Sequence, residues 1–194
     1  CWYKGELKQS IQRPGLEIYD RVGGGDSFAS GLIYGFMTFD DAEKAVNAHN
    51  NLMDWGMQVS LVAVTSKPGE AISVYHNDDR VFGLTPSGSA PAVVEGKDNV
   101  YQLCFSDPNQ GTASANYIAD QGLATKVAVI YKNDDVYSTG IYNSFKAKAD
   151  ELALNIVSTT TFTTDSQTDF SVQIADAKDN GADLVFLPMY YDAA

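Results

Sequence analysis

Three consecutive glycines and an aspartate, Gly23, Gly24, Gly25 and Asp26, stand where a turn would open onto an apolar helix at 27–37. Backbone N–H groups at such a turn, together with the helix dipole, can bind an anion. Asp26 could take a proton from an attacking hydroxyl while the amides stabilise a transferred phosphoryl group. A glycine turn with Asp26 as the helix N-cap explains the same residues without chemistry. The segment is neither a Walker A loop nor a dinucleotide-binding G-x-G-x-x-G.

A second set of residues consists of hydroxyls on loops that follow predicted strands: Ser66, Ser87, Ser89, Tyr137 and Tyr190. In an open parallel sheet, ligands bind at the carboxyl ends of the strands, where helix N-termini favour a carboxylate. Hydroxyls and adjacent backbone groups can serve both the carboxylate and the ammonium of an amino acid, and a tyrosine ring can cover an aliphatic side chain. Helix-capping serines and tyrosines near strand ends by chance would give the same pattern.

The remaining polar residues indicate no metal or redox centre. His49 and His76 lack partners at ligand spacing, so we expect surface or core histidines. Cys1 and Cys104 form no C-x-x-C pair. The run Asn-Asp-Asp at 133–135 lacks the spacing of a calcium loop and indicates a solvated turn.

The elements that must position these residues alternate along the chain. Apolar, strand-like runs are predicted at 59–64, 81–84, 100–105, 127–131, 155–157 and 183–187. Helical patterns are predicted between them at 68–76, 110–121, 138–152 and 169–180, with Ser138 and Asp169 as plausible caps. This alternation predicts an α/β fold with a mostly parallel sheet covered by helices on both faces. The first forty residues differ: a polar hairpin, the glycine break and the helix at 27–37 precede a helix at 40–55.

The composition and net charge of the chain exclude some classes of binding partner. The chain has 194 residues, 44% of them hydrophobic, which is ample for a packed core. Its net charge of -12 disfavours nucleic acid and anionic membranes as partners. No apolar run reaches the roughly 20 residues of a membrane helix, and the opening residues are no signal peptide. We expect a partial chain at both ends, because it begins without methionine and stops just after a strand-like run.

Residues 1–47 resemble the C-terminal part of PfkB-type, ribokinase-like sugar kinases, especially 2-keto-3-deoxygluconate kinases. The resemblance lies in Tyr-Asp-Arg-Val-Gly-Gly-Gly-Asp-Ser-Phe-Ala-Ser-Gly at 19–31. It implies Asp26 as catalytic base, Gly23, Gly24 and Gly25 as the anion hole, and ATP with Mg²⁺ as cofactors. The sugar-binding lobe and most of the nucleotide pocket would lie outside this chain, so we expect no phosphoryl transfer.

Residues 41–194 resemble the leucine/isoleucine/valine-binding proteins of ABC importers, which have the type I periplasmic-binding fold. The resemblance is carried by the segments at 51–54, 64–66, 85–93, 105–111, 168–171 and 187–191. It implies amino-acid capture without chemistry or a cofactor, a membrane permease as partner, and a periplasmic or extracellular location for the parent protein. The family's ligand contacts would fall on Ser66, Ser87, Ser89, Tyr137 and Tyr190.

The sequence also departs from the pattern of this second family at both ends. The family's first strand and helix are replaced by the kinase-like piece, and its second lobe stops before the acidic residue that usually meets the ligand ammonium. We therefore expect an incomplete periplasmic-binding region at 48–194, with impaired binding, preceded by a ribokinase-like fragment at 1–47. Three hypotheses stay open: amino-acid binding, a sugar kinase that uses Asp26, and an inactive chimera.

Overall fold

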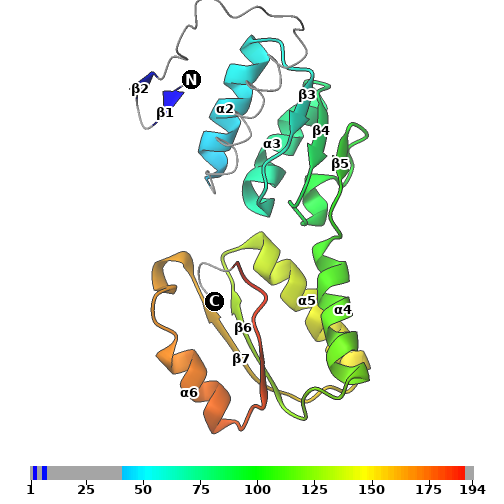
Figure 1. Cartoon of the computed structure of the whole chain (residues 1–194), viewed down its shortest axis with the longest axis vertical. Helices are drawn as coiled ribbons and strands as arrows, with labels where there is room; N and C mark the ends of the chain where they lie inside the picture. Colours follow the sequence, from blue (N-terminus) through cyan, green and yellow to red (C-terminus); the bar gives the residue numbers. More distant parts are fainter. Residues whose placement is uncertain (1, 4–5, 8–40, 191–194) are drawn as a thin grey trace, which may run out of the picture.

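The computed structural model describes residues 2–3, 6–7 and 41–190 (Figure 1). The predicted kinase residues, Asp26 with Gly23, Gly24 and Gly25, and the predicted helix at 27–37 lie outside these residues. The helices are α2 (Ala42–Asp54), α3 (Ser66–Asp78), α4 (Asp107–Asp120), α5 (Val136–Glu151) and α6 (Ser171–Asp179), with short 3₁₀ turns at Pro91–Val93 and Thr164–Ser166. The strands are β1 (Trp2–Tyr3), β2 (Glu6–Leu7), β3 (Val59–Leu61), β4 (Phe82–Thr85), β5 (Val100–Gln102), β6 (Val127–Lys132), β7 (Ile156–Phe162) and β8 (Leu184–Phe186).

The predicted α/β fold with parallel strands is confirmed, but the strands after residue 41 divide between two sheets. The first sheet has the order β3-β4-β5 and the second β7-β6-β8, and each neighbouring pair is parallel. We call residues 41–102 the first lobe and residues 107–190 the second lobe. Figure 1 shows the lobes one above the other, with α4 leading from the first into the second.

The first lobe forms because α2 and α3 bury one face each against the sheet. Asp41 caps α2 by accepting hydrogen bonds from the amides of Glu43 and Lys44. Ala45, His49 and Leu52 then follow at helical spacing and are buried. Within the described residues these helices cover one face of the sheet. The other face exposes a set of large apolar side chains: Val59, Leu61, Phe82 and Tyr101.

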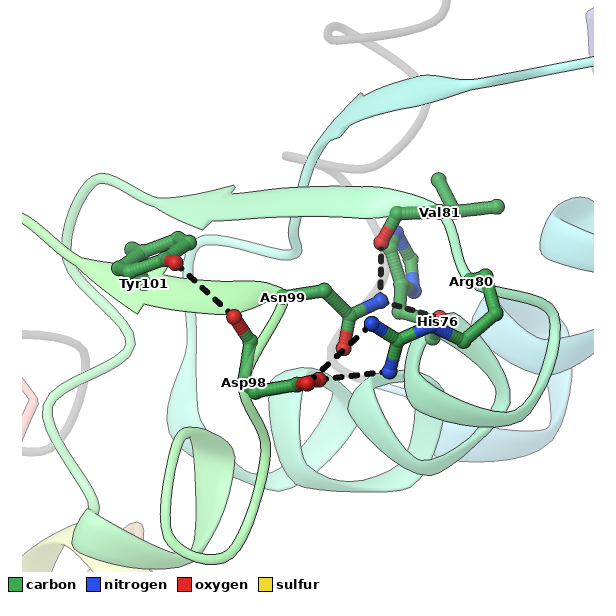
Figure 2. Close-up of polar contacts among 6 residues, drawn as sticks. All are labelled: His76, Arg80, Val81, Asp98, Asn99 and Tyr101. Atoms are coloured by element: carbon green, nitrogen blue, oxygen red, sulfur yellow. Dashed lines mark hydrogen bonds and ion pairs between the residues drawn. The ribbon is translucent and has the colours of Figure 1, made fainter.

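Polar clamps tie the end of α3 to the strands of the first lobe (Figure 2). The Asn99 side-chain amide donates to the carbonyls of His76 and Val81, at 2.8 and 2.7 Å. Beside it, Arg80 and Asp98 form an exposed ion pair with an N–O distance of 2.6 Å. The start of β5 is thus held to the last turn of α3.

The second lobe has helices on both faces of its sheet, as predicted. Alternate residues of β6 are buried on opposite sides, and Val127 and Val129 belong to a core cluster with α4 and α5. Ile130 faces a hollow lined by α6. Figure 1 shows α6 on one side of this sheet and α4 with α5 on the other.

In the predicted helix at 138–152, the helical spacing of four apolar residues predicts one stripe packed against the sheet, formed by Ile141, Phe145, Ala149 and Leu152. This prediction is largely confirmed. Ile141, Phe145 and Ala149 are buried, and the Phe145 ring stacks on Phe186 of β8 with centroids 4.1 Å apart. Leu152 differs, because it follows the last helical residue and is exposed.

Some helices and strands begin or end at other residues than predicted, mainly where the prediction depended on polar residues as caps or strand ends. α5 begins at Val136 with Asp135 as its cap, so Ser138 lies inside the helix and not before it. α6 begins at Ser171, and Asp169 accepts a hydrogen bond from the Ser171 amide one residue before the cap position. β7 runs on to Phe162 through the Thr-rich segment, because β-branched residues suit a pleated strand. Among the helices of the described ranges, none is long and apolar enough to cross a bilayer.

Candidate functional site

Ser66 is the first residue of α3 and is fully buried. Its amide donates to the Tyr190 hydroxyl of the second lobe at 3.3 Å, and its own hydroxyl accepts from the Ala90 amide at 3.2 Å. The first N–H groups of a helix have no partner within the helix, and the dipole favours an oxygen or an anion there. The start of α3 is therefore a receptor for an oxygen that comes from the other lobe.

Ser87 and Ser89 follow β4 but have different surroundings. The Ser87 hydroxyl is exposed and donates to the Val64 carbonyl at 2.7 Å, so it closes a turn between the ends of β3 and β4. Ser89 is buried, and its carbonyl accepts from the Asp107 amide at 3.0 Å. Of the two serines, Ser89 thus lies where the chain enters the second lobe.

The two predicted tyrosines lie against each other. Tyr137 belongs to the first turn of α5 and Tyr190 follows β8, and their rings stack with centroids 4.5 Å apart and an angle of 16° between the planes. Burial raises the pKa of Tyr137, and the carboxyl groups of Asp107 and Asp135 raise it further. The stacked pair presents an aromatic surface of the second lobe next to Ser66.

A buried hydroxyl holds this aromatic pair in place. Ser138 donates to the Pro188 carbonyl at 2.5 Å and accepts from the Lys132 amide at 2.8 Å. It therefore joins the end of β6, the start of α5 and the segment that carries Tyr190. The structure brings together Ser66, Tyr137 and Tyr190 from the predicted set, places Ser89 at the crossing between the lobes, and leaves Ser87 in a turn.

Asp107 is a functional candidate that the sequence reasoning missed. It is fully buried at the start of α4, and within the described residues neither of its carboxylate oxygens has a partner at full hydrogen-bond geometry. Burial raises the pKa of Asp107 to about 6; the nearby Ser89 hydroxyl opposes this change and the Asp135 carboxyl adds to it. A buried carboxyl without a cationic partner is uncommon outside functional sites.

The signal for Asp107 was local and weak. It lies in the segment Ser106-Asp107-Pro108, which has the composition of a helix start, whereas the helix was expected to begin at 110. Its burial depends on Gly140 of α5, where an added Cβ would stand 3.1 Å from one Asp107 oxygen. Contacts across that sequence separation have no signature in a single sequence.

Other features of the described residues lie apart from this group. His49 and His76 are core residues in contact, with ring centroids 4.6 Å apart. In the described part of the chain, no group of three His, Cys, Asp or Glu side chains is placed to hold a metal ion. An apolar hollow of about 400 Å³ lies between α6 and β8, and none of the predicted binding residues lines it. It is lined by Ile130, Phe170, Ile174, Leu184, Leu187 and Met189.

Comparisons with known proteins identify the family of the chain. The sequence model of the periplasmic binding protein family matches residues 38–194. A curated amino acid binding protein of Pseudomonas aeruginosa is 28% identical over 153 residues, which cover 76% of this chain and 40% of that protein.

Two solved structures are similar as well. A leucine-binding protein, LivK, from Thermotoga maritima is 28% identical with a TM-score of 0.71, over 76% of this chain and 42% of its own. The branched-chain amino acid binding protein LivJ from Streptococcus pneumoniae, in complex with isoleucine, is 24% identical with a TM-score of 0.73, over 80% and 44%.

The chain thus spans about two fifths of the length of these relatives, and nothing in them points to a kinase segment. The family match covers both lobes that the structure describes. The chain belongs to the periplasmic binding protein family.

Proposed function

We propose that this chain is part of the solute-binding component of an ABC importer and that it recognises a branched-chain-type amino acid. The observation that carries the proposal is the contact between the Ser66 amide of the first lobe and the Tyr190 hydroxyl of the second. A ligand carboxylate that replaces this hydroxyl would meet a helix N-terminus on one side and the stacked rings of Tyr137 and Tyr190 on the other. The amino-acid ligands named for the relatives support the same class of ligand.

The role proposed for the site is capture and not chemistry. The α3 N-terminus and the Ser89 region supply polar groups for the carboxylate, and the tyrosine rings supply a surface for an aliphatic side chain. Such binding needs no cofactor. The partner would be a membrane permease and the location periplasmic or extracellular, as expected for a periplasmic binding protein.

Calorimetric titration with leucine, isoleucine and valine tests the proposal. We expect saturable heat and a rise in the thermal unfolding temperature, because a ligand that binds only the folded state stabilises it. Tyr137→Ala should weaken binding by removing half of the aromatic surface, whereas Tyr117→Ala, an exposed tyrosine of α4, should leave it unchanged. Absence of both heat and stabilisation at millimolar concentrations of all three amino acids would refute the proposal for this chain.

The sugar-kinase hypothesis rests on a separate observation, the motif at 19–31. Asp26, Gly23, Gly24 and Gly25 lie outside the described residues, so their roles stay predictions. The test is turnover of ATP and Mg²⁺ with 2-keto-3-deoxygluconate. Activity that disappears in Asp26→Asn would support the hypothesis, and activity that survives the change would exclude Asp26 as the base.

A further inference from the structure

We propose that two copies of this chain form a dimer through the exposed face of the first sheet. Within the described residues, α2 and α3 pack on one face of this sheet, in a core cluster with Val100 of β5. The opposite face carries five large apolar side chains, and we call it the apolar sheet face: Val59, Leu61, Phe82, Tyr101 and Leu103. The inference concerns the assembly of the chain and does not depend on the ligand of the proposed function.

The pleat and register of the strands make these side chains one continuous surface. Val59 and Leu61 of β3 are exposed and Ser60 between them is buried, because alternate residues of a strand point to opposite faces. Val59 lies beside Phe82 of β4 in the parallel ladder. The Phe82 ring in turn stacks on Tyr101 of β5, with centroids 5.5 Å apart. The apolar sheet face therefore extends across all three strands of the first sheet.

Polar groups border this face at the amino ends of β4 and β5. Arg80 and Asp98 form an exposed ion pair there, with an N–O distance of 2.6 Å (Figure 2). The Tyr101 hydroxyl donates to the Asp98 carbonyl at 2.9 Å, so its polar atom is bonded while its ring stays exposed. At the other end, the Leu103 amide donates to the Thr85 carbonyl at 3.0 Å and continues the ladder. An apolar centre with a polar border is the arrangement of a protein–protein interface.

The area of the apolar sheet face is sufficient for a dimer. Each of its five side chains exposes between 41% and 74% of its surface. At about 100 Å² of exposed surface for each side chain, two copies in contact remove on the order of 1,000 Å² from water. This area reaches the lower end of the range for specific interfaces, so we expect a reversible dimer. Burial of this face also agrees with the rule that parallel sheets are covered on both sides.

The charges at the border favour a second copy of the chain as the partner. Two copies related by a twofold axis present the same surface to each other, so that surface must be complementary to itself. The five side chains of the apolar sheet face are uncharged, although the chain has a net charge of -12. The border pair supplies one charge of each sign, and the Arg80 of one copy can approach the Asp98 of the other. A border of carboxylates alone would repel its own copy.

Sedimentation velocity of the 194-residue chain between about 1 and 100 µM tests the inference. We expect a monomer–dimer equilibrium with a Kd on the order of 10 µM. Phe82→Lys and, separately, Leu103→Lys should raise this Kd at least about tenfold, because each brings a charge into the apolar contact. Val172→Lys changes an exposed apolar residue of α6 and is the matched control, which should keep the Kd. A dimer that both substitutions in the apolar sheet face leave intact would contradict the inference.

Hydroxyl-radical labelling at the same concentrations identifies what covers the face. Tyr101 should become protected as the concentration rises, whereas Tyr117, an exposed tyrosine of α4, should be labelled equally throughout. A monomer in which Tyr101 is labelled at every concentration would overturn the inference. A monomer in which Tyr101 is protected at every concentration would overturn it as well, since another part of the same chain would then cover the face.

Discussion

The two lobes achieve similar folds with different interactions. In the first lobe, buried polar groups join the elements: His49 and His76 lie between α2 and α3, and Asn99 ties the strands to the end of α3 (Figure 2). In the second lobe, close helix packing and stacked rings join the elements. Gly111 of α4 lies directly against α5, and the Phe145 ring stacks on Phe186. The first lobe should therefore respond to protons and to lost hydrogen bonds, and the second to added volume.

The largest expected effect is overpacking of the second lobe. In Gly111→Ala the new Cβ would stand 2.2 Å from the Ser144 hydroxyl oxygen, 2.3 Å from the Ile141 carbonyl oxygen and 2.6 Å from the Phe145 amide nitrogen. Because two of these atoms are backbone, α4 and α5 must move apart, and we expect a loss of about 3 kcal/mol in unfolding free energy by denaturant titration.

Gly122→Ala is the matched control for this substitution. Gly122 has a φ of 56° and no atom within 4 Å of an added Cβ, so only backbone strain is expected, about 1 kcal/mol. Equal losses in the two variants would contradict the close approach of α4 and α5.

The second effect breaks a polar clamp of the first lobe. Asn99→Ala removes the hydrogen bonds to the His76 and Val81 carbonyls, both on buried residues, and should cost about 2 kcal/mol. Hydrogen exchange should accelerate for amides of β4 and β5 and not for those of β6. Asn180→Ala removes a single exposed hydrogen bond to the Asp176 carbonyl and should change stability by less than about 0.5 kcal/mol. Uniform acceleration in both lobes would show that they unfold as one unit.

The third effect is a difference in pH dependence between the lobes. Burial lowers the pKa of His76, His49 lowers it further, and a hydrogen bond to the Ile72 carbonyl and the Asp79 charge oppose this. The unfolded chain then binds more protons than the folded one just below pH 6.5, so the stability of the first lobe should fall as the solution is acidified through that range.

Asp107 should act in the opposite direction. Its pKa is about 6 in the folded chain against 3.8 without the fold, so its unfavourable contribution appears as the pH rises from about 4 to about 6. Unfolding followed by lobe-specific probes between pH 4 and 8 should show that His76→Gln reduces the acid sensitivity of the first lobe, while Asp107→Asn removes the alkaline-side penalty at the start of α4. A pH profile left unchanged by His76→Gln would contradict the assignment to that histidine.

The smallest effect concerns the exposed ion pair of the first lobe. Arg80 lowers the pKa of Asp98, and Asp98 raises that of Arg80, but both side chains are largely in solvent. Asp98→Asn should not shift the denaturation midpoint measurably at physiological salt, because solvent and ions screen the pair. A clear shift would mean that charge at the surface contributes to the first lobe as much as its buried polar groups do.

The sequence predicts the elements better than their assembly. Apolar runs and helical stripes such as Ile141, Phe145 and Ala149 locate the strands and helices, because burial imposes their periods. The alternation of strands and helices alone predicts one mostly parallel sheet, because residues 103–106, which lead from β5 into α4, have no distinctive composition. Only the resemblance to a family with two lobes implies the division into two sheets. The sequence predicts a strand only at 155–157 and not the Thr-rich second half of β7, because threonine suits both loops and strands.

The candidate site was predicted in part for a similar reason. The positions of Ser66, Tyr137 and Tyr190 follow from strand ends, and the structure brings them together. The different environments of Ser87 and Ser89 could not be predicted. The Ser87 hydroxyl donates to the carbonyl of Val64, which lies in the loop after β3, and this contact depends on the fold. Asp107 was missed because its burial is decided by distant backbone.

Ser138 couples the position of the stacked tyrosines to that of α5. Its hydroxyl donates to the Pro188 carbonyl and so joins the segment after β8 to α5. Ser138 directly follows Tyr137, and Pro188 lies two residues before Tyr190. The stacked rings therefore behave as a single part mounted on α5. When Tyr190 leaves the Ser66 amide, either α5 is displaced with it, or the bond from Ser138 to Pro188 breaks and the rings separate. In the first case, the loss of one hydrogen bond between the lobes is coupled to a displacement of the whole of α5.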